Sequence, residues 1–255
     1  MDRSASALAG QWRDRVTQLT TAQPEGVLPY DAEVIGAVRD SAADSPGNDV
    51  VVCAAGTLPA ELHKLWRAGE PGNYHVEYGF SCMGYEIAGA LGVKMARPRQ
   101  EVIVMVGDGS YMMMNSELAT SVMLGQKLII VVLDNRGYGC IHRLQRASGG
   151  ACFNNMLDDC LPQEGGAAST INFAAHAASM GAQAVHVADV RALKAAMVKA
   201  RAASQTQVIV IDTTAERTTG DGGCWWEVAI PEISERAEVN AAHVRYVSEK
   251  QNQRL

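Results

Sequence analysis

The segment "EVIVMVGDGSYMMMNSE", residues 101–117, decides the fold class. Its first six residues form an apolar run rich in β-branched side chains, which is typical of a strand buried on both faces within a parallel sheet. The run stops at Gly107-Asp108-Gly109, and a segment with helical character follows. A carboxylate between two glycines at the end of a buried strand therefore needs an explanation, which the rest of the chain helps to supply.

The flanking sequence repeats this alternation of apolar strands and helices. Strands are expected at 49–55, 101–106, 127–134, 182–188 and 207–213, and helices at 59–66, 83–96, 115–125, 171–181 and 190–203. The pattern predicts an α/β domain with a doubly wound, mostly parallel sheet and helices on both faces. We assign this domain to residues 46–213, a lead-in helix and linker outside the core to 1–45, and a C-terminal extension to 214–255.

Composition narrows the classes of partner. With 255 residues, 47% of them hydrophobic, the chain can bury a sizeable core. A net charge of -6 without a basic run disfavours nucleic acid and anionic membranes as partners. No apolar stretch approaches the roughly 20 residues that span a bilayer, and the N-terminus does not resemble a signal peptide, so a cytoplasmic protein is expected.

Several residues have a structural interpretation. The six cysteines are scattered without a C-x-x-C pair and are expected to be reduced and mostly buried. His176 and His186 lie in apolar stretches and are expected to be core residues. The pair Trp225-Trp226 is expected to anchor packing or an interface. The segment 136–170 is long and Gly-rich and is expected to be a functional loop without regular structure.

Residues 107–110 lie where ligands bind in open parallel sheets, outside the carboxyl ends of the strands. Gly107 and Gly109 let the backbone approach a ligand closely, and the Ser110 hydroxyl and nearby amides suit phosphate oxygens. Asp108 supplies a hard oxygen ligand for Mg²⁺. On this segment alone, a tight turn without a ligand is the favoured interpretation.

A second strand end strengthens the metal hypothesis. The segment "KLIIVVLDNRGYG", residues 127–139, ends its apolar run at Asp134-Asn135 and continues to Gly137. An Asn135 side-chain oxygen and a Gly137 backbone carbonyl, together with Asp108, would complete an octahedral Mg²⁺ shell with two phosphate oxygens and a water. Two adjacent strand ends would then converge on one ion.

Together these segments resemble the thiamine diphosphate (ThDP) signature of pyruvate decarboxylase-like and acetohydroxyacid synthase-like enzymes. In that family G-D-G-S is followed, about two dozen residues later, by a strand end that contains Asn. The family usually has Asn-Asn where this chain has Asp134-Asn135. The second position ligates the metal in the family, so the departure is expected to be tolerated, with the extra carboxylate tuning the site.

The resemblance extends to the pyrimidine end of the cofactor. Residues 77–98, "EYGFSCMGYEIAGALGVKMARP", are similar to the family's G-x-M-G segment. By resemblance, the Ser81 carbonyl accepts a hydrogen bond from the exocyclic amine, the Met83 amide donates to a ring nitrogen, and the Met83 side chain lies between the two rings. Core packing on a Gly/Ala-rich helix is the alternative for Met83.

Further cofactor contacts follow from the same likeness. The stretch "AAGTLPAELHKLW", residues 54–66, resembles the family's first strand-helix turn. Gly56, Thr57 and Leu58 are therefore expected to contact the diphosphate, and Tyr138 is included among the cofactor contacts. The residues Met112-Met113-Met114 are expected to pack along a helix face.

A closer likeness is carried by four stretches. "VCAAGTLPAELHKLW", "YHVEYGFSCMGYEIAGALG", "DNRGYGCIHRLQ" and "GGCWWEV" are similar to the C-terminal third of the trihydroxycyclohexane-dione hydrolases of myo-inositol catabolism, over about 31–238. This implies a ThDP-dependent hydrolase that cleaves a C–C bond to open a trihydroxycyclohexane-1,2-dione ring. Side chains near the motifs are candidates for contact with this polyhydroxylated cyclic dione: His63, His75, Glu77, Tyr78, Tyr138 and His142.

The resemblance also implies that a domain is missing. In this superfamily a glutamate from an upstream pyrimidine-binding domain activates the cofactor, and this chain has room only for the diphosphate domain. The chain alone is expected to be inactive, and its complete enzyme is expected to be a homodimer or homotetramer. Two alternatives remain open: a subunit of another two-component ThDP enzyme, such as a 2-oxoacid decarboxylase or synthase, and a non-catalytic nucleotide-binding module.

Overall fold

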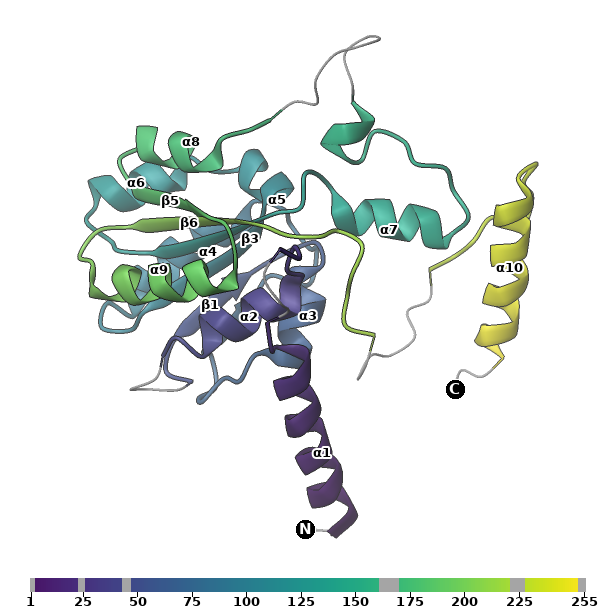
Figure 1. Ribbon diagram of the computed structural model, residues 1–255, viewed down its shortest axis with the longest axis horizontal. Coiled ribbons are helices and arrows are strands. Elements are labelled where there is room, and N and C mark those ends of the chain that lie inside the picture. The colour runs from purple at the N-terminus through teal and green to yellow at the C-terminus, as the bar shows by residue number, and fades with distance from the viewer. Residues whose placement is uncertain (1–2, 23–25, 43–46, 161–169, 221–227, 252–255) are drawn as a thin grey trace.

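The fold is built around one six-stranded parallel sheet (Figure 1). The computed structural model describes residues 3–22, 26–42, 47–160, 170–220 and 228–251. The strand order is β2-β1-β3-β4-β6-β5, and every paired strand is parallel to its neighbour. The strands are β1 (Val50–Cys53), β2 (Tyr74–Val76), β3 (Val102–Gly107), β4 (Ile129–Asp134), β5 (Gln183–Val187) and β6 (Gln207–Asp212). The predicted fold class is confirmed.

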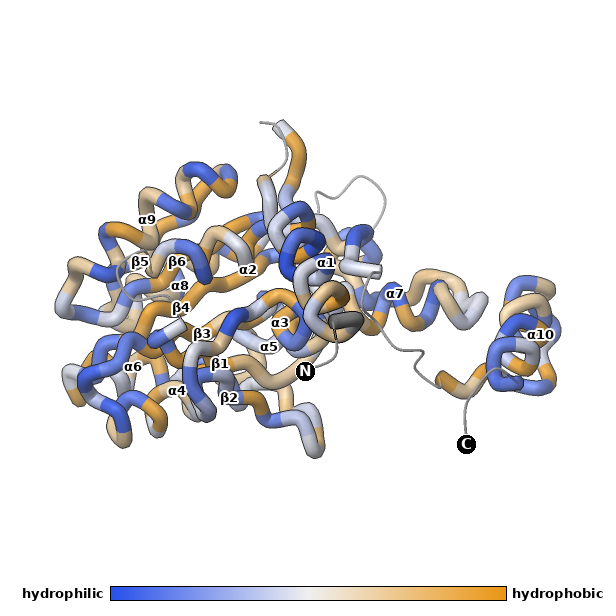
Figure 2. Tube along the Cα trace, turned by 90° about the horizontal axis from the view of Figure 1, so that it is seen from below, coloured by the Kyte–Doolittle hydropathy of each residue, from blue (hydrophilic) through white to orange (hydrophobic). Residues whose placement is uncertain are grey.

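Apolar side chains on both faces of the strands explain why the sheet is covered twice. Along β3, Ile103 and Met105 belong to one buried cluster, whereas Val102, Val104 and Val106 belong to a second. Such alternation places successive side chains on opposite faces of a strand. Figure 2 shows the apolar strands running through the interior, between the layers of helices.

Two layers of helices bury these clusters. One layer packs against the cluster that contains Ile103, and it consists of α2 (Asp31–Arg39), α3 (Leu58–Leu65) and α9 (Val190–Ala202). The other layer packs against the cluster that contains Val104, and it consists of α4 (Tyr85–Ala96), α6 (Glu117–Met123) and α8 (Phe173–Ser179). This is the doubly wound arrangement expected of a parallel sheet.

The register of the sheet decides which loops meet. Gly107 at the end of β3 lies opposite Leu133 of β4, and Asp134 at the end of β4 lies opposite Asp212 of β6. The residues that follow β3 and β4 therefore begin at the same edge of the sheet. The short helix α5 (Asp108–Met113) starts there without an intervening loop.

Helix α2 corrects the expectation that residues 1–45 lie outside the core. Every residue from Asp31 to Arg39 is buried, and Val34, Ile35 and Val38 belong to the cluster beneath α2 and α9. Acidic side chains at Asp31 and Glu33 interrupt the apolar pattern and hide it from a sequence reading. By contrast, α1 (Arg3–Leu19) projects from the body in Figure 1, with Val16 buried near its end.

Other elements also differ from the sequence-based expectations. The edge strand β2 was not predicted, and the expected loop 136–170 contains α7 (Gly139–Ala147) and the 3₁₀ turn η1 (Leu157–Asp159). The helix expected at 115–125 is shorter, and α5 precedes it as a separate helix. The C-terminal extension contains the helix α10 (Ala237–Lys250), whereas Trp225-Trp226 lies outside the described residues.

Surface exposure corrects three residue-level expectations. Met112, Met113 and Met114 are each about half exposed and do not pack along a buried helix face. His186 is exposed at the edge strand, where its Nε2 lies 2.9 Å from Asp212 Oδ1. Of the five described cysteines, all unpaired, only Cys53 is buried. Among the described helices, none is both long and apolar enough to cross a membrane.

Candidate functional site

A cavity of about 320 Å³ opens at the carboxyl ends of β1, β3 and β4. All twelve residues predicted to bind cofactor or metal line it: Gly56, Thr57, Leu58, Ser81, Met83, Gly107, Asp108, Gly109, Ser110, Asn135, Gly137 and Tyr138. They come from four segments that are far apart in the sequence. The parallel register brings these segments to one edge, as expected for an open α/β sheet.

Two glycines allow the cavity wall to close. A Cβ on Gly109 would lie 2.7 Å from Tyr138 Cε1, so only glycine lets the Tyr138 ring pack against the start of α5. Gly137 has φ +141°, and a Cβ there would lie 2.5 Å from the Asn155 carbonyl oxygen. Substitution at Gly109 would displace the Tyr138 ring, and substitution at Gly137 would push its segment away from the backbone at Asn155.

The oxygens at the ends of β3 and β4 are incompletely bonded. Asp108 is buried, and its Oδ2 accepts a 2.6 Å hydrogen bond from the Gly137 amide. Its Oδ1 and Asn135 Oδ1 are both buried, and neither has a hydrogen-bond partner among the described residues. Since buried polar atoms are nearly always satisfied, two such oxygens on one cavity wall indicate a missing ligand. Hard oxygen donors of this kind fit a divalent cation such as Mg²⁺.

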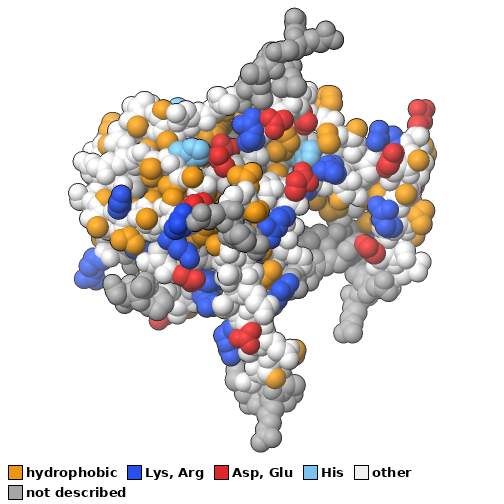
Figure 3. All heavy atoms as spheres, viewed as in Figure 1, with side chains coloured by type: hydrophobic (Ala, Val, Ile, Leu, Met, Phe, Trp, Pro, Cys, Tyr) orange, Lys and Arg blue, Asp and Glu red, His pale blue; other side chains and the backbone are white. Residues whose placement is uncertain are grey.

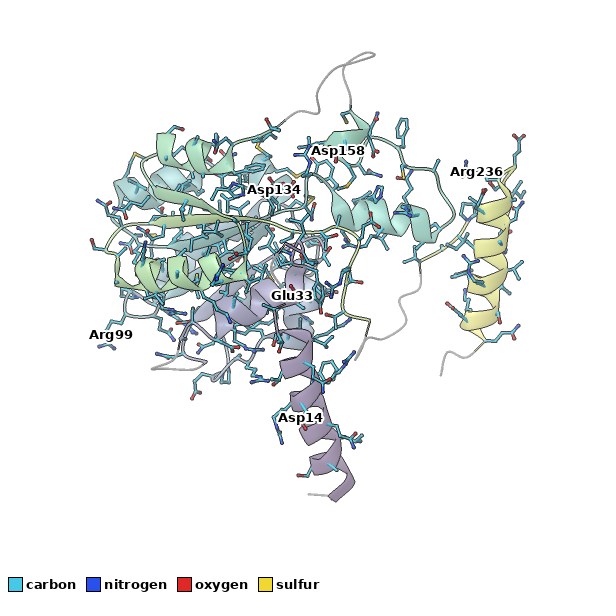
Figure 4. The ribbon with its side chains drawn as sticks, viewed as in Figure 1. Asp14, Glu33, Arg99, Asp134, Asp158 and Arg236 are labelled. Carbon is cyan, nitrogen blue, oxygen red and sulfur yellow. The ribbon has the colours of Figure 1, made fainter. Side chains whose placement is uncertain are left out.

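Electrostatics support a cation at the same place. Burial, followed by the neighbouring Asp134 carboxylate, raises the pKa of Asp108 above its usual range. Asp134 lies at the end of β4, beside the segment that leads to α7 (Figure 4), and its Oδ1 accepts a 2.9 Å bond from the Arg136 amide. Two nearby carboxylates create a negative potential that a cation would relieve. The described residues offer no cluster of three or more His, Cys, Asp or Glu side chains for a metal. A metal here would therefore need amide or backbone oxygens as well.

The bonding of Ser110 departs from the role predicted for its hydroxyl. Ser110 Oγ donates a 2.7 Å hydrogen bond to Glu86 Oε1 and accepts a 2.9 Å bond from the Gly84 amide. The hydroxyl hydrogen is thus directed to a buried carboxylate and away from a phosphate oxygen. Glu86 was missed by the sequence reading, although a lone acid in the Gly/Ala-rich stretch "MGYEIAGALG", residues 83–92, is a usable signal.

Most of the candidates for substrate contact lie away from the cavity wall. Only Tyr138 of the six lines the cavity. His63 Nδ1 lies 2.5 Å from the Tyr74 hydroxyl and stacks on Tyr78, and His75 Nε2 lies 2.5 Å from the Tyr85 hydroxyl. These histidines therefore join a tyrosine-rich cluster near the β2 edge of the sheet.

Glu77 and His142 have other positions. Glu77 accepts hydrogen bonds from the amides of Phe80 and Cys82, at 3.1 and 2.7 Å, and so shapes the loop that precedes Met83. These amide donors hold the pKa of Glu77 below its usual range. His142 is buried on α7, and its Nδ1 has no hydrogen-bond partner among the described residues.

A carboxyl group that sequence reasoning missed lines the cavity beside these residues. Asp31, the first residue of α2, is buried in the cavity wall. Burial raises the pKa of Asp31 to about 7, with Glu61 adding to the rise and Arg143 opposing it. Arg143 of α7 donates to Thr57 Oγ1 and to the Ala215 carbonyl, which joins α7 to the first strand-helix turn and to the C-terminal extension.

The fold and the cavity together define an α/β cofactor-binding domain. Residues 54–213 match the family described as "Thiamine pyrophosphate enzyme, C-terminal TPP binding domain", and the chain belongs to this family. Its curated relatives include the 3D-(3,5/4)-trihydroxycyclohexane-1,2-dione hydrolases of Bacillus cereus and Bacillus anthracis. Each is 40% identical to this chain over 208 residues, which cover 80% of this chain and 32% of the relative. The chain therefore spans about a third of the length of these relatives.

A solved structure shows the same fold. The thiamine diphosphate-dependent 4-hydroxybenzoylformate decarboxylase of Rhodococcus jostii superposes with a TM-score of 0.62 at 21% sequence identity. The superposition covers 76% of this chain and 34% of the decarboxylase chain. At this identity the similarity establishes the fold of the domain. Its chemistry has to be argued from the residues of the site.

Proposed function

We propose that this chain holds thiamine diphosphate through Mg²⁺ in the described cavity, as the cofactor-binding domain of a hydrolase that cleaves a C–C bond in a cyclic 1,2-dione. The observation that supports this most directly is a pair of buried oxygens on the wall of one cavity, Asp108 Oδ1 and Asn135 Oδ1, which have no hydrogen-bond partner among the described residues. A cation bound to both would satisfy them and would neutralise the diphosphate that it attracts.

The metal would be held by three groups of this chain. Asp108 and Asn135 would each supply a side-chain oxygen, and Gly137 would supply its backbone carbonyl. The hydrogen bond from the Gly137 amide to Asp108 Oδ2 supports this assignment, because it already ties the two strand ends together at 2.6 Å. Asp134 would remain outside the ligand set and would strengthen the local negative potential.

The cofactor would lie between the remaining wall segments. Gly56, Thr57 and Leu58 would face the diphosphate together with Gly107, Gly109 and Ser110, and Ser81 and Met83 would face the pyrimidine end. When bound, thiamine diphosphate supplies a carbanion nucleophile and an electron sink for C–C bond cleavage. Apolar side chains of Ile141 and Leu144 in the wall would help to exclude water.

The substrate class comes from the relatives. Their names specify a trihydroxycyclohexane-1,2-dione, and the 40% identity over 208 residues supports a polyhydroxylated cyclic dione as the substrate of the complete enzyme. From this chain, Tyr138 is the candidate for contact with that substrate, since it alone among the predicted contacts lines the cavity.

A pyrimidine-binding domain would complete the site. The relatives are about three times longer than the matched part, which leaves room for such a domain in the complete enzyme. Exposed apolar residues next to or within the cavity wall suit a protein neighbour: Phe80 is 91% exposed, Ile141 51% and Leu144 43%. We further propose that the complete enzyme is a homodimer or homotetramer.

Calorimetric titration of ThDP, with and without Mg²⁺, tests the metal site. We expect binding that requires Mg²⁺ in the wild type and that is lost in Asp108→Ala, because the substitution removes one of the two unpartnered oxygens. Asp158→Ala is a matched control, since Asp158 is exposed and pairs with Arg136 outside the cavity wall. Equal, Mg²⁺-independent binding by the wild type and Asp108→Ala would contradict the proposal, as would a wild type that binds no cofactor.

A further inference from the structure

Behind the cavity wall, Glu86 joins segments that are separated in the sequence. Its Oε2 accepts a 2.9 Å hydrogen bond from the Gly84 amide, and its Oε1 accepts the 2.7 Å bond from Ser110 Oγ. The Gly84 amide also donates to Ser110 Oγ at 2.9 Å, so the three groups form a closed ring of bonds.

Each bonded group belongs to or adjoins a different part of the wall. Gly84 follows Met83, and Ser110 ends the Gly107–Ser110 segment. Glu86 itself is not among the lining residues and is 1% exposed. It therefore fastens two wall segments from the protein side and leaves the cavity free for a ligand.

A simple helix cap does not account for this arrangement. A capping side chain on residue 84 has no room, because Gly84 has φ +93° and a Cβ there would lie 2.7 Å from Met114 Cβ. Glu86 reaches back to the Gly84 amide, but it also bonds to Ser110, which follows the end of β3. Burying a carboxylate is costly, and a cap alone would be satisfied by a solvent-exposed acid at the first turn.

The two principal segments differ in secondary structure. Ser110 lies in α5, which follows β3 directly, whereas Ser81 and Met83 lie in a stretch without helix or strand. In that stretch Ser81 has φ +52°, and the adjacent Phe80 is 91% exposed. Loss of the Glu86 bonds would therefore release the stretch at 81–83 more than it would disturb Ser110.

We propose that Glu86 is a positioning residue that fixes the Ser81–Met83 segment at a set separation from Gly107–Ser110. One ligand with a ring at one end and a diphosphate at the other can then be gripped at both ends. The inference rests on the proposed function for the ligand's identity. The ring of hydrogen bonds around Glu86 carries it independently of the metal.

Comparison of two ligands tests this role. Glu86→Gln places an amide donor opposite either the Gly84 amide or the Ser110 hydroxyl, so one bond of the ring is reversed or lost, and we expect it to weaken binding of Mg²⁺-ThDP by about tenfold, as for loss of one net hydrogen bond. Binding of Mg²⁺-pyrophosphate, which lacks the rings, should change by less than about threefold. Equal losses for both ligands, or no loss for either, would overturn the inference. A wild type that binds neither ligand would overturn the proposed function itself.

A measurement without ligand separates the two proposals. Hydrogen exchange of the amides at 79–84 should be faster in Glu86→Gln than in the wild type, while exchange at 107–110 stays close to the wild-type rate. Ser110→Ala breaks the same ring from the other side and should give the same pattern if Glu86→Gln does not fold. Glu33→Gln is the matched control, because Glu33 is also 1% exposed but faces Arg217. Unchanged exchange at 79–84 in both ring variants would refute the positioning role.

Discussion

At the scale of single residues, a buried acid on the cavity wall carries a cost that depends on pH. Asp31 and Glu61 are both buried acids. Burial and the Glu61 carboxylate raise the pKa of Asp31, and the Arg143 guanidinium opposes this rise. Because the folded-state pKa of Asp31 lies above the unfolded value of 3.8, protonation favours the fold. The contribution of Asp31 to the free energy of unfolding is therefore fully present below the unfolded pKa of 3.8. This contribution is lost as the pH rises through about 7.

Replacement of this carboxyl should remove the pH dependence that it causes. Asp31→Asn is expected to be more stable than the wild type at pH 8, with a difference that shrinks towards pH 4. The rise of the pKa from 3.8 to about 7 sets an upper bound of roughly 4 kcal/mol on the gain. Urea unfolding across this pH range measures it. Asp14→Asn, on the exposed face of α1, is the control; parallel stability curves for Asp31→Asn and the wild type would disprove the assignment.

At the scale of elements, continuous apolar runs made the sheet predictable. The five predicted strands all occur, within a few residues of their expected ends, because β-branched runs such as "VIVMV" at 102–106 suit a strand covered on both faces. The wall residues at 107–110 and 135–137 followed from the strand ends, whereas those at 56–58 and 81–83 followed from the resemblance to the ThDP-dependent enzymes. Helix α2 was missed because its acids interrupt its apolar pattern, and β2 because it is three residues long and only partly buried.

Side-chain partnerships were the part that sequence could not supply. His63 and His75 bond to tyrosines that lie ten or eleven residues further along the chain, and Glu86 bonds to Ser110 across 24 residues. Such pairings depend on how loops meet in three dimensions, which periodicity and local motifs do not encode. The same limit applies to Arg143, whose contacts to Thr57 and Ala215 span 86 and 72 residues.

Helix α7 is held against the cavity by this arginine. Arg143→Ala should release α7, since it removes the hydrogen bonds to Thr57 Oγ1 and the Ala215 carbonyl, and hydrogen exchange of the amides at 139–147 should rise. Arg146→Ala is the matched control on the same helix, because Arg146 forms an exposed pair with Glu216 at 3.1 Å. Equal exchange in the two variants would count against a specific role for Arg143.

At the scale of the whole molecule, apolar side chains remain exposed to solvent around the cavity. Figure 3 shows apolar side chains distributed among charged ones over one face of the body. Near the cavity, Phe80, Ile141 and Leu144 remain exposed. Within the described residues, the cavity wall contains aspartates but no glutamate. These features support a site that a second domain completes.

We therefore expect no ring opening by this chain alone. Incubated with ThDP, Mg²⁺ and the cyclic dione, it should leave the dione unchanged, because the glutamate that would activate the cofactor is expected from another domain. Chromatography of the dione over time, with the full-length Bacillus cereus relative as the positive control, measures this outcome. Consumption of the dione at a rate that depends on the concentration of this chain would refute the expectation.

The strand order also has a consequence for how the chain is made. β6 lies between β4 and β5 in the sheet, although it is the last strand in the sequence, and Ile129 of β4 pairs with Gln207 of β6. During synthesis, the hydrogen-bonding edge of β4 has to wait until residues 207–212 have left the ribosome. The apolar run "IIVVL" at 129–133 is meanwhile an unpaired edge that can associate with other nascent chains. A nascent chain that stops before β6 would therefore need protection by a chaperone.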